Sequence, residues 1–143
     1  MISVICVYND EAILERYLLK SLEQQTEKGE VILLDNTNGR FSSAAEALNF
    51  GGNKGSSKYL MFVHQDVLLP SSDWLLKAEH YLDSIPKLGI AGVAGMVEGG
   101  RSNEERGRNV IKHGESPKEW NWGHPISTRE PVQTLDELMV IIP

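Results

Sequence analysis

The sequence predicts one α/β domain with a mostly parallel, Rossmann-like sheet flanked by helices. Short apolar runs alternate with amphipathic helical patterns over the first hundred residues, which favours parallel strands joined by right-handed crossovers. The chain has 143 residues, 41% of them hydrophobic, so it is long enough to bury one real core. Polar residues follow each of the first three apolar runs, where a parallel sheet binds its ligands.

The first strand is expected over residues 2–7, an unbroken apolar run typical of a strand buried on both faces. Cys6 lies within it, as a small buried apolar residue. Asn9 and Asp10 offer N-caps for a helix over residues 11–24. The apolar face of that helix is set by residues four positions apart, namely Leu14, Leu18 and Leu22.

The second buried strand is expected over residues 31–34 and is followed by turn residues 36–39. Ser43 and Glu46 have the spacing of a capping box, which predicts a short helix after the turn. Three glycines, with Lys54 among them, are expected mainly to stop this helix. Their spacing matches neither a P-loop nor G-x-G-x-x-G, so the alternative of a phosphate loop is weakly supported. The glycines are Gly51, Gly52 and Gly55.

The third buried strand is expected over residues 59–63, and a helix is expected after residues 71–73. The apolar face of this helix is Leu75, Ala78, Leu82 and Ile85. A fourth strand over residues 90–97 is rich in small residues, which predicts that another backbone approaches it closely. We divide the domain into residues 1–97, a long loop over 98–131 without periodicity, and a returning strand over 132–142. Because the chain stops inside an apolar run, we expect the natural protein to continue beyond Pro143.

Composition excludes several classes of function. The net charge of −6 argues against a nucleic-acid binder and against adsorption to an anionic membrane surface. One cysteine excludes an intrachain disulfide framework and a cysteine-based zinc cluster, and it favours a reducing, cytoplasmic location. The apolar runs are too short to span a bilayer, and the first residues lack the features of a signal peptide.

The carboxyl ends of the first three strands carry the candidate site residues, which we expect to converge at one edge of the sheet. Asp66 comes after the third strand, and it is either a ligand for Mg²⁺ or Mn²⁺ or a cap for the next segment of the chain. His64 would lie on the same side of an extended chain. It is either a second metal ligand or a histidine bonded to a neighbouring loop. Asp35 either accepts hydrogen bonds from a nucleotide or forms its own turn.

Four segments, in this order, resemble the nucleotide-sugar-binding half of the large inverting family of GT-A fold glycosyltransferases (glycosyltransferase family 2). Residues 2–10 (ISVICVYND) are similar to the family's first strand and Y-N-E turn. Residues 31–36 (VILLDN) resemble its second strand and D-D-G-S turn, and residues 47–51 (ALNFG) its A-R-N-x-G element. Residues 59–66 (YLMFVHQD) resemble the strand that leads to its D-x-D motif, here in an H-Q-D-V form. Asn49 precedes His64 by 15 positions, an interval that suits the family.

The resemblance implies a domain that binds a nucleotide-diphosphate sugar, such as a UDP- or dTDP-sugar, and transfers the sugar to a hydroxyl of a saccharide or other acceptor with inversion. Tyr8, Asn9 and Asp35 would line the pocket for base and ribose, and Asn49 would belong to the substrate-binding set. Asp66 would hold a divalent ion, Mn²⁺ or Mg²⁺, on the diphosphate, with His64 in place of the motif's first acid. The loop over 98–131 would form the acceptor side.

The chain departs from the family at several positions. Leu48 stands at the arginine of A-R-N. The family's usual general base, an acid downstream of the last strand, has no counterpart among residues 1–143, so the catalytic base is unassigned. The only acids after residue 131 are Asp136 and Glu137, for which we expect a structural role. Trp120 and Trp122 either stack against the acceptor or pack the loop down. The rival functions are a nucleotide-sugar-binding module without turnover and a nucleotidyltransferase, although the latter needs a glycine-rich loop after the first strand.

Overall fold

The computed structural model describes residues 1–114, 118–119 and 123–143 and forms two compact units. The first unit comprises Met1–Ile90 together with Ile141–Pro143, and the second comprises Ala91–Val140. All of the candidate residues Tyr8, Asn9, Asp35, Asn49, His64 and Asp66 lie in the first unit.

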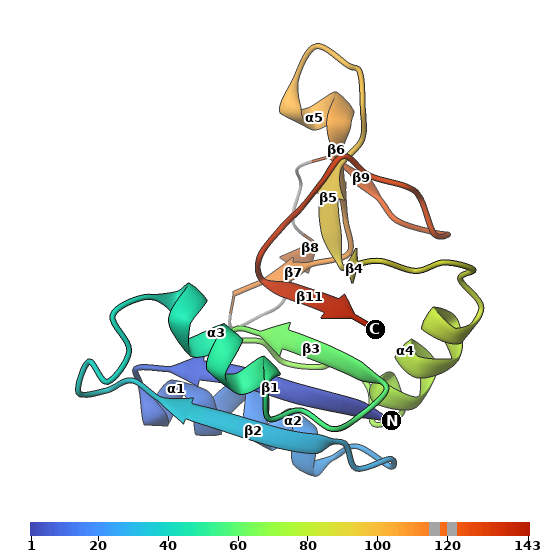
Figure 1. The fold of residues 1–143 in the computed structure, drawn as a ribbon. Coiled ribbons are helices and arrows are strands. Elements are labelled where there is room, and N and C mark those ends of the chain that lie inside the picture. Colours follow the sequence, from blue (N-terminus) through green and yellow to red (C-terminus); the bar gives the residue numbers. More distant parts are fainter. Residues whose placement is uncertain (115–117, 120–122) are drawn as a thin grey trace. The chain divides into compact units, whose positions relative to one another are not determined.

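The sheet of the first unit has the strand order β2-β1-β3-β11 (Figure 1). Its strands are β1 (Ile2–Tyr8), β2 (Glu30–Asp35), β3 (Tyr59–Val63) and β11 (Met139–Ile142). Strand β1 pairs in parallel with β2 on one side and with β3 on the other. The expected parallel pairing is therefore confirmed for the first three strands, and Tyr8 lies opposite Asp35 where β1 and β2 end.

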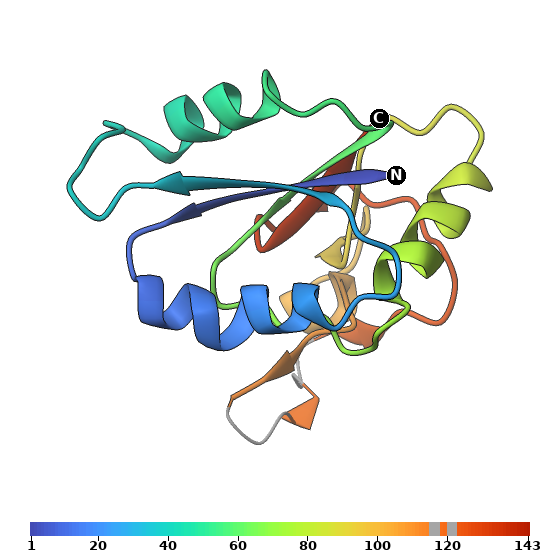
Figure 2. The same ribbon diagram turned by 90° about the horizontal axis from the view of Figure 1, so that it is seen from below.

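Helices cover both faces of these three strands (Figure 2). One face carries a continuous helix made of α1 (Glu11–Leu14), the π-helical segment η1 (Glu15–Leu19) and α2 (Lys20–Glu23). The opposite face carries α3 (Ala44–Gly52). The connection from β1 to β2 and the connection from β2 to β3 thus pass over different faces, as right-handed crossovers to opposite sides of β1 require.

The first helix has the predicted apolar face but not the predicted regularity. Leu14, Leu18 and Leu22 are all buried, as their spacing indicates. The helix was expected to be α-helical throughout residues 11–24, whereas the main-chain N–H of Lys20 bonds the carbonyl of Glu15, five residues back. Such a wide turn has no signature in the apolar pattern, because the leucines on either side of it keep their face.

Helix α3 begins where the capping pattern predicts, since the main-chain N–H of Glu46 donates to Ser43 Oγ at 3.2 Å. The helix stops among the glycines, as expected, because Gly51 and Gly52 are its last two residues and Asn53 is the C-cap. Gly51 is required there by packing. A Cβ on this residue would lie 2.6 Å from Ile5 Cγ2 and 2.8 Å from Leu34 Cδ1. Glycine therefore lets α3 approach the sheet closely enough to bury Ala47.

Strand β2 is not buried on both faces, contrary to expectation. Leu34 is buried and Ile32 packs beside it against the core under α3. Val31 and Leu33 point the other way and are 43% and 38% exposed. The reason is position, because β2 is the edge strand of the sheet and the burial of an edge strand depends on what covers it. An apolar run alone does not distinguish an edge strand from a central one.

Helix α4 (Trp74–Asp83) is joined to the first helix by a buried amide. Gln25 Nε2 donates to the carbonyls of Ser21 and Ser71, at 3.1 and 2.8 Å, and its Oε1 accepts from the main-chain N–H of Leu75 at 3.0 Å. Leu75 and Leu82 of the predicted apolar face are buried, whereas Ala78 and Ile85 are partly buried and Ile85 lies beyond the end of α4. Cys6, also buried, is confirmed as a core residue of β1.

The second unit is built from short strands, most of them in the segment expected to be a loop. Strand β5 (Ala94–Met96) pairs antiparallel with β6 (Gly107–Asn109) and with β10 (Thr134–Leu135), and β6 pairs in parallel with β9 (His124–Pro125). The other elements are β4 (Ala91–Gly92), α5 (Asn103–Arg106), β7 (Lys112–His113) and β8 (Lys118–Glu119), of which β7 and β8 pair antiparallel.

These elements correct three expectations of continuous structure. The strand predicted over residues 90–97 is divided into β4 and β5, the loop over 98–131 contains paired strands, and the strand over 132–142 is divided into β10 and β11. The close backbone approach predicted for residues 90–97 is confirmed, because a Cβ on Gly95 would lie 2.4 Å from the carbonyl oxygen of Thr134. In the part of the chain that the structure describes, no helix has the length and apolar character needed to cross a membrane.

Candidate functional site

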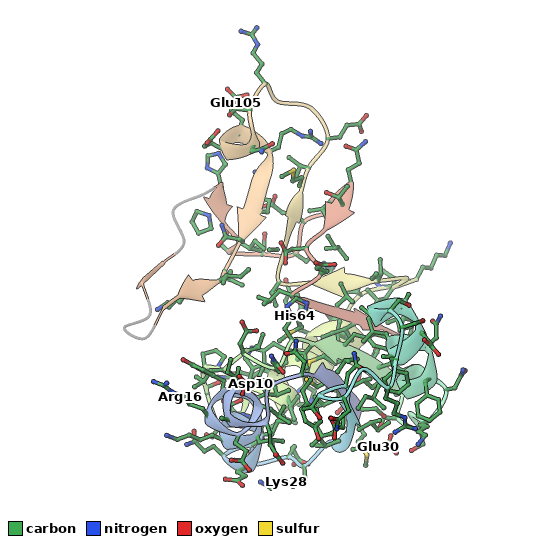
Figure 3. All side chains as sticks on the ribbon, turned by 90° about the vertical axis from the view of Figure 1, so that its left-hand side faces the viewer. Asp10, Arg16, Lys28, Glu30, His64 and Glu105 are labelled. Atoms are coloured by element: carbon green, nitrogen blue, oxygen red, sulfur yellow. The ribbon has the colours of Figure 1, made fainter. Side chains whose placement is uncertain are left out.

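The loops after β1, β2 and β3 are hydrogen-bonded to one another at the carboxyl edge of the sheet. The main-chain N–H of Asn36, after β2, donates to the carbonyl of Tyr8 at the end of β1, at 2.8 Å. The side chain of Gln65, after β3, bonds the loop after β1. Figure 3 views the first unit from this edge and labels Asp10 and His64, which come from the loops after β1 and β3. The structure thus brings together the three segments that the sequence predicts to converge.

Gln65 makes three hydrogen bonds across this edge. Its Oε1 accepts from the main-chain N–H groups of Asn9 and Asp10, at 2.9 and 3.2 Å, and its Nε2 donates to Asn9 Oδ1 at 2.8 Å. From the sequence, Gln65 is expected at this edge with His64 and Asp66, but without a role of its own. Its only signal is its place between His64 and Asp66, because an amide side chain after a strand has no distinctive pattern.

Protein groups accept from several main-chain donors around the beginning of α1. Asp10 is the N-cap, and its Oδ1 accepts from the main-chain N–H of Ile13 at 3.0 Å. With Gln65 bonded to the N–H groups of Asn9 and Asp10, three main-chain donors at this helix start already have acceptors. A helix start that binds phosphate needs such donors free. Residues 8–11 also contain no glycine, so the loop after β1 is not the glycine-rich phosphate loop that a nucleotidyltransferase would need here.

Asp35 uses one of its two oxygens to form a turn. Its Oδ1 accepts from the main-chain N–H of Thr37 at 2.8 Å and from the Thr37 hydroxyl at 2.7 Å. These bonds, the main-chain one first, together with the charge of Arg40, hold the pKa of Asp35 below its usual value. Oδ2 accepts no bond from the described residues and the side chain is exposed, so both the turn and a ligand contact are compatible with the geometry.

We expect the Thr37→Val substitution to raise the pKa of Asp35 part of the way to its unperturbed value, because the hydroxyl bond is lost and the main-chain bond remains. Since the folded-state pKa lies below the unfolded value of about 3.9, this carboxylate contributes stability above that pH. The contribution disappears as the pH falls through the folded-state pKa. NMR titration of the Asp35 carboxyl carbon in both proteins measures the shift. An unchanged pKa would contradict the assigned bond.

Tyr8 is half-buried beside Asp35 at the end of β1. Desolvation, followed by the nearby charges of Asp35 and Glu11, raises the pKa of its phenol. The phenol therefore stays neutral at physiological pH, with a hydroxyl that can both donate and accept a hydrogen bond.

Cys6 lies two residues before Tyr8 in β1 and is fully buried. Burial, with a smaller contribution from the charge of Asp66, raises the pKa of its thiol to about 12. Because the thiolate is the reactive form, we expect the native protein at pH 8 to react negligibly with a thiol reagent such as DTNB. The protein in urea should react completely. Rapid labelling of the native protein would show that β1 opens far more readily than its burial indicates.

His64 and Asp66 lie on a turn and not on an extended chain, which corrects the argument that placed them on one side of a strand. Strand β3 ends at Val63, residues 65 and 66 are in the turn, and the main-chain N–H of Val67 bonds the His64 carbonyl at 3.4 Å. Both side chains are exposed at the edge that carries Tyr8 and Asn9. Within residues 1–114, 118–119 and 123–143, no three His, Cys, Asp or Glu side chains form a group that could hold a metal ion.

Asn49 is set apart from the other predicted residues. It lies in the second turn of α3 on the exposed side of the helix, whereas Ala47 and Gly51 are buried against the sheet. The described contacts do not join Asn49 to Tyr8, Asn9 or Asp35. Trp120 and Trp122, the candidate stacking residues, lie outside the described residues.

The late acid Asp136 has a local structural part in the second unit. Its Oδ1 accepts from the main-chain N–H of Leu138 at 2.9 Å, and its own main-chain N–H donates to the carbonyl of Ala94 at 3.0 Å. These bonds fix the turn after β10, as expected for a residue with a structural role.

Comparison with known proteins identifies a family for the chain. A search of curated proteins finds no match to the chain. The model of a glycosyltransferase-like family matches residues 3–141, which includes both units almost completely. Since this match extends over nearly the whole chain, the protein belongs to this glycosyltransferase-like family.

Proposed function

We propose that the carboxyl edge of β1, β2 and β3 binds a nucleotide-diphosphate sugar and that the protein transfers the sugar to an acceptor hydroxyl with inversion. The observation that carries this proposal is the hydrogen-bonded convergence of the three loops that hold Tyr8, Asp35 and Asp66. Ligands of parallel sheets bind at this edge, beside the point where the strand order reverses. Membership of the glycosyltransferase-like family favours a sugar donor and acceptor over other ligands.

The nucleoside would contact Tyr8, Asn9 and Asp35. The free carboxylate oxygen of Asp35 is an acceptor for ribose hydroxyls or for a base N–H, and the Tyr8 ring offers a half-buried apolar surface beside it. The Asn9 side chain is exposed at the same edge and can donate or accept. We include Asn49 in the substrate-binding set on the resemblance alone, because it lies in α3 and not in one of the loops after the strands.

The side chains after β3 fit a divalent ion whose coordination shell is completed by the substrate. Asp66 offers a carboxylate, which Mg²⁺ and Mn²⁺ both accept, and His64 offers an imidazole, which suits Mn²⁺ better. Because the described residues contain no group of three such side chains, the remaining ligands would be diphosphate oxygens and water. When bound there, the ion would stabilise the negative charge that develops on the departing diphosphate. This H-Q-D turn would then act as the family's D-x-D motif.

The transfer itself needs one further group. The acceptor oxygen forms a bond to the anomeric carbon while the bond from that carbon to the diphosphate oxygen breaks, and the acceptor proton passes to a general base. The nucleoside diphosphate leaves with the bonding electrons. We assign no base, because Asp136 is engaged in its turn. The alternative function is therefore a module that binds the nucleotide sugar without turnover, and the experiment below distinguishes the two.

The test is titration calorimetry with UDP- and dTDP-sugars, each with and without Mn²⁺, followed by an assay for release of nucleoside diphosphate with and without saccharide acceptors. We expect binding that strengthens when Mn²⁺ is added, and diphosphate release that increases with the right acceptor. Binding without release would support the module. The absence of binding to every nucleotide sugar would reject the proposal.

A further inference from the structure

Gln65 bridges β1 and β3, the two strands between which the nucleotide sugar would bind. Strand β2 lies on one side of β1 and β3 on the other, so the strand order reverses between β1 and β3. Open parallel sheets bind ligands at this point. The amide of Gln65 reaches across it from the turn after β3 to Asn9 and Asp10 after β1, with bonds of 2.8 to 3.2 Å.

The bonding pattern fixes which way both amides face. Two main-chain N–H groups, those of Asn9 and Asp10, point at one atom of Gln65, and only an oxygen can accept from both. The other atom is then the Nε2 donor, so the atom of Asn9 that it bonds must be the Oδ1 acceptor. Asn9 Nδ2 is consequently turned away from Gln65. Among the described residues it has no hydrogen-bond partner, and the side chain is exposed.

We propose that Gln65 is a positioning residue for the donor nucleoside. It orients Asn9 so that the Nδ2 hydrogens face the ligand and donate to an oxygen of its base or ribose. This inference rests on the proposed function, which places the nucleoside at Asn9, and it extends that function by assigning a hydrogen-bond polarity to the contact. Gln65 itself acts through Asn9 and need not touch the donor.

The Gln65→Glu substitution separates this role from a merely structural one. The new carboxylate can still accept from the two main-chain N–H groups, and its negative charge is favourable at a helix start. It has no hydrogen to donate to Asn9 Oδ1, so the Asn9 amide is expected to turn over and donate Nδ2 to the carboxylate. An acceptor oxygen would then face the nucleoside, where the wild-type protein presents a donor.

Gln65→Leu is the uncharged comparison, because it removes all three bonds. Gln24→Glu is the matched control for the added charge, since Gln24 is exposed at the far end of the first helix, after α2. Uridine and thymidine, titrated without metal, are suitable probes because they carry no charge that the new carboxylate could repel. NMR exchange of the Asn9 and Asp10 main-chain amides with water reports the bridge independently of any ligand.

We expect Gln65→Glu to keep the slow exchange of both amides and a melting temperature no lower than that of the wild type, yet to bind nucleoside about tenfold more weakly. In Gln65→Leu, both amides should exchange with water faster and the nucleoside should bind weakly. Gln24→Glu should match the wild type in amide exchange and in nucleoside affinity. Wild-type affinity in Gln65→Glu, or wild-type amide exchange in Gln65→Leu, would overturn the inference. A wild-type protein that binds nucleotide sugars but neither nucleoside would overturn the inference alone, whereas binding of none of them would reject the proposed function as well.

Discussion

The Asp66→Asn substitution is expected to reduce kcat/KM for sugar transfer by about 100-fold or more. A neutral amide replaces the carboxylate that would hold the divalent ion, so the charge that develops on the departing diphosphate loses its stabilisation. Asp66 is exposed at the end of the sheet and makes none of the hydrogen bonds that join the three loops. The substitution should therefore leave the fold unchanged, with a melting temperature close to that of the wild type.

The affinity for Mn²⁺ in the presence of nucleoside diphosphate should fall together with the activity. Glu15→Gln is the matched control, because it makes the same change from carboxylate to amide at an exposed position on η1. We expect this control to retain full activity and metal affinity. Asp66→Asn with normal activity and normal Mn²⁺ dependence would remove this residue from the site.

The Gly51→Leu substitution is expected to destabilise the protein by about 3 kcal/mol. A Cβ at this position would already overlap Ile5 Cγ2 at 2.6 Å and Leu34 Cδ1 at 2.8 Å, and both of these residues are buried in strands of the sheet. A leucine there would force α3 away from the sheet or push two core side chains from their rotamers. Urea denaturation monitored by circular dichroism measures the loss in the free energy of unfolding.

The neighbouring glycine provides the comparison. Gly52 also lies in α3, but a Cβ on it would lie 3.3 Å from Phe62 Cζ, the tip of a half-buried ring that can move. Gly52→Ala gains helix propensity of up to about 1 kcal/mol, which offsets the small displacement. We expect its unfolding free energy to stay within about 0.5 kcal/mol of the wild type. Equal effects at Gly51 and Gly52 would show that helix propensity, and not close packing, decides both.

The features that local chemistry determines were predictable from the sequence. The strands β1 and β3, the cap at Ser43 and the buried leucines of the first helix depend on residues close together in the chain, and each is confirmed. The loops at the carboxyl edge were predictable for the same reason, because parallel strands that alternate with helices must place their ends together.

The features that depend on distant partners were not predictable. The exposure of Val31 and Leu33 results from the edge position of β2, which their own segment does not encode. The short strands of the second unit have only two or three residues each, too few for a periodic pattern, and they exist because other segments pair with them. In the site, the bonds that Gln65 makes were not predictable because its partners lie 55 and 56 residues away.

The wide turn at residues 15–19 implies a particular tolerance to changes in chain length. A turn of this kind contains one residue more than an α-helical turn, while Leu14 before it and Leu22 after it keep the same buried face. A relative that lacks one residue in this segment could close the helix into regular α-helical geometry without moving the loop at Asn9. Removing two residues would instead rotate the rest of the helix, by about 100°, and would turn Gln25 away from α4.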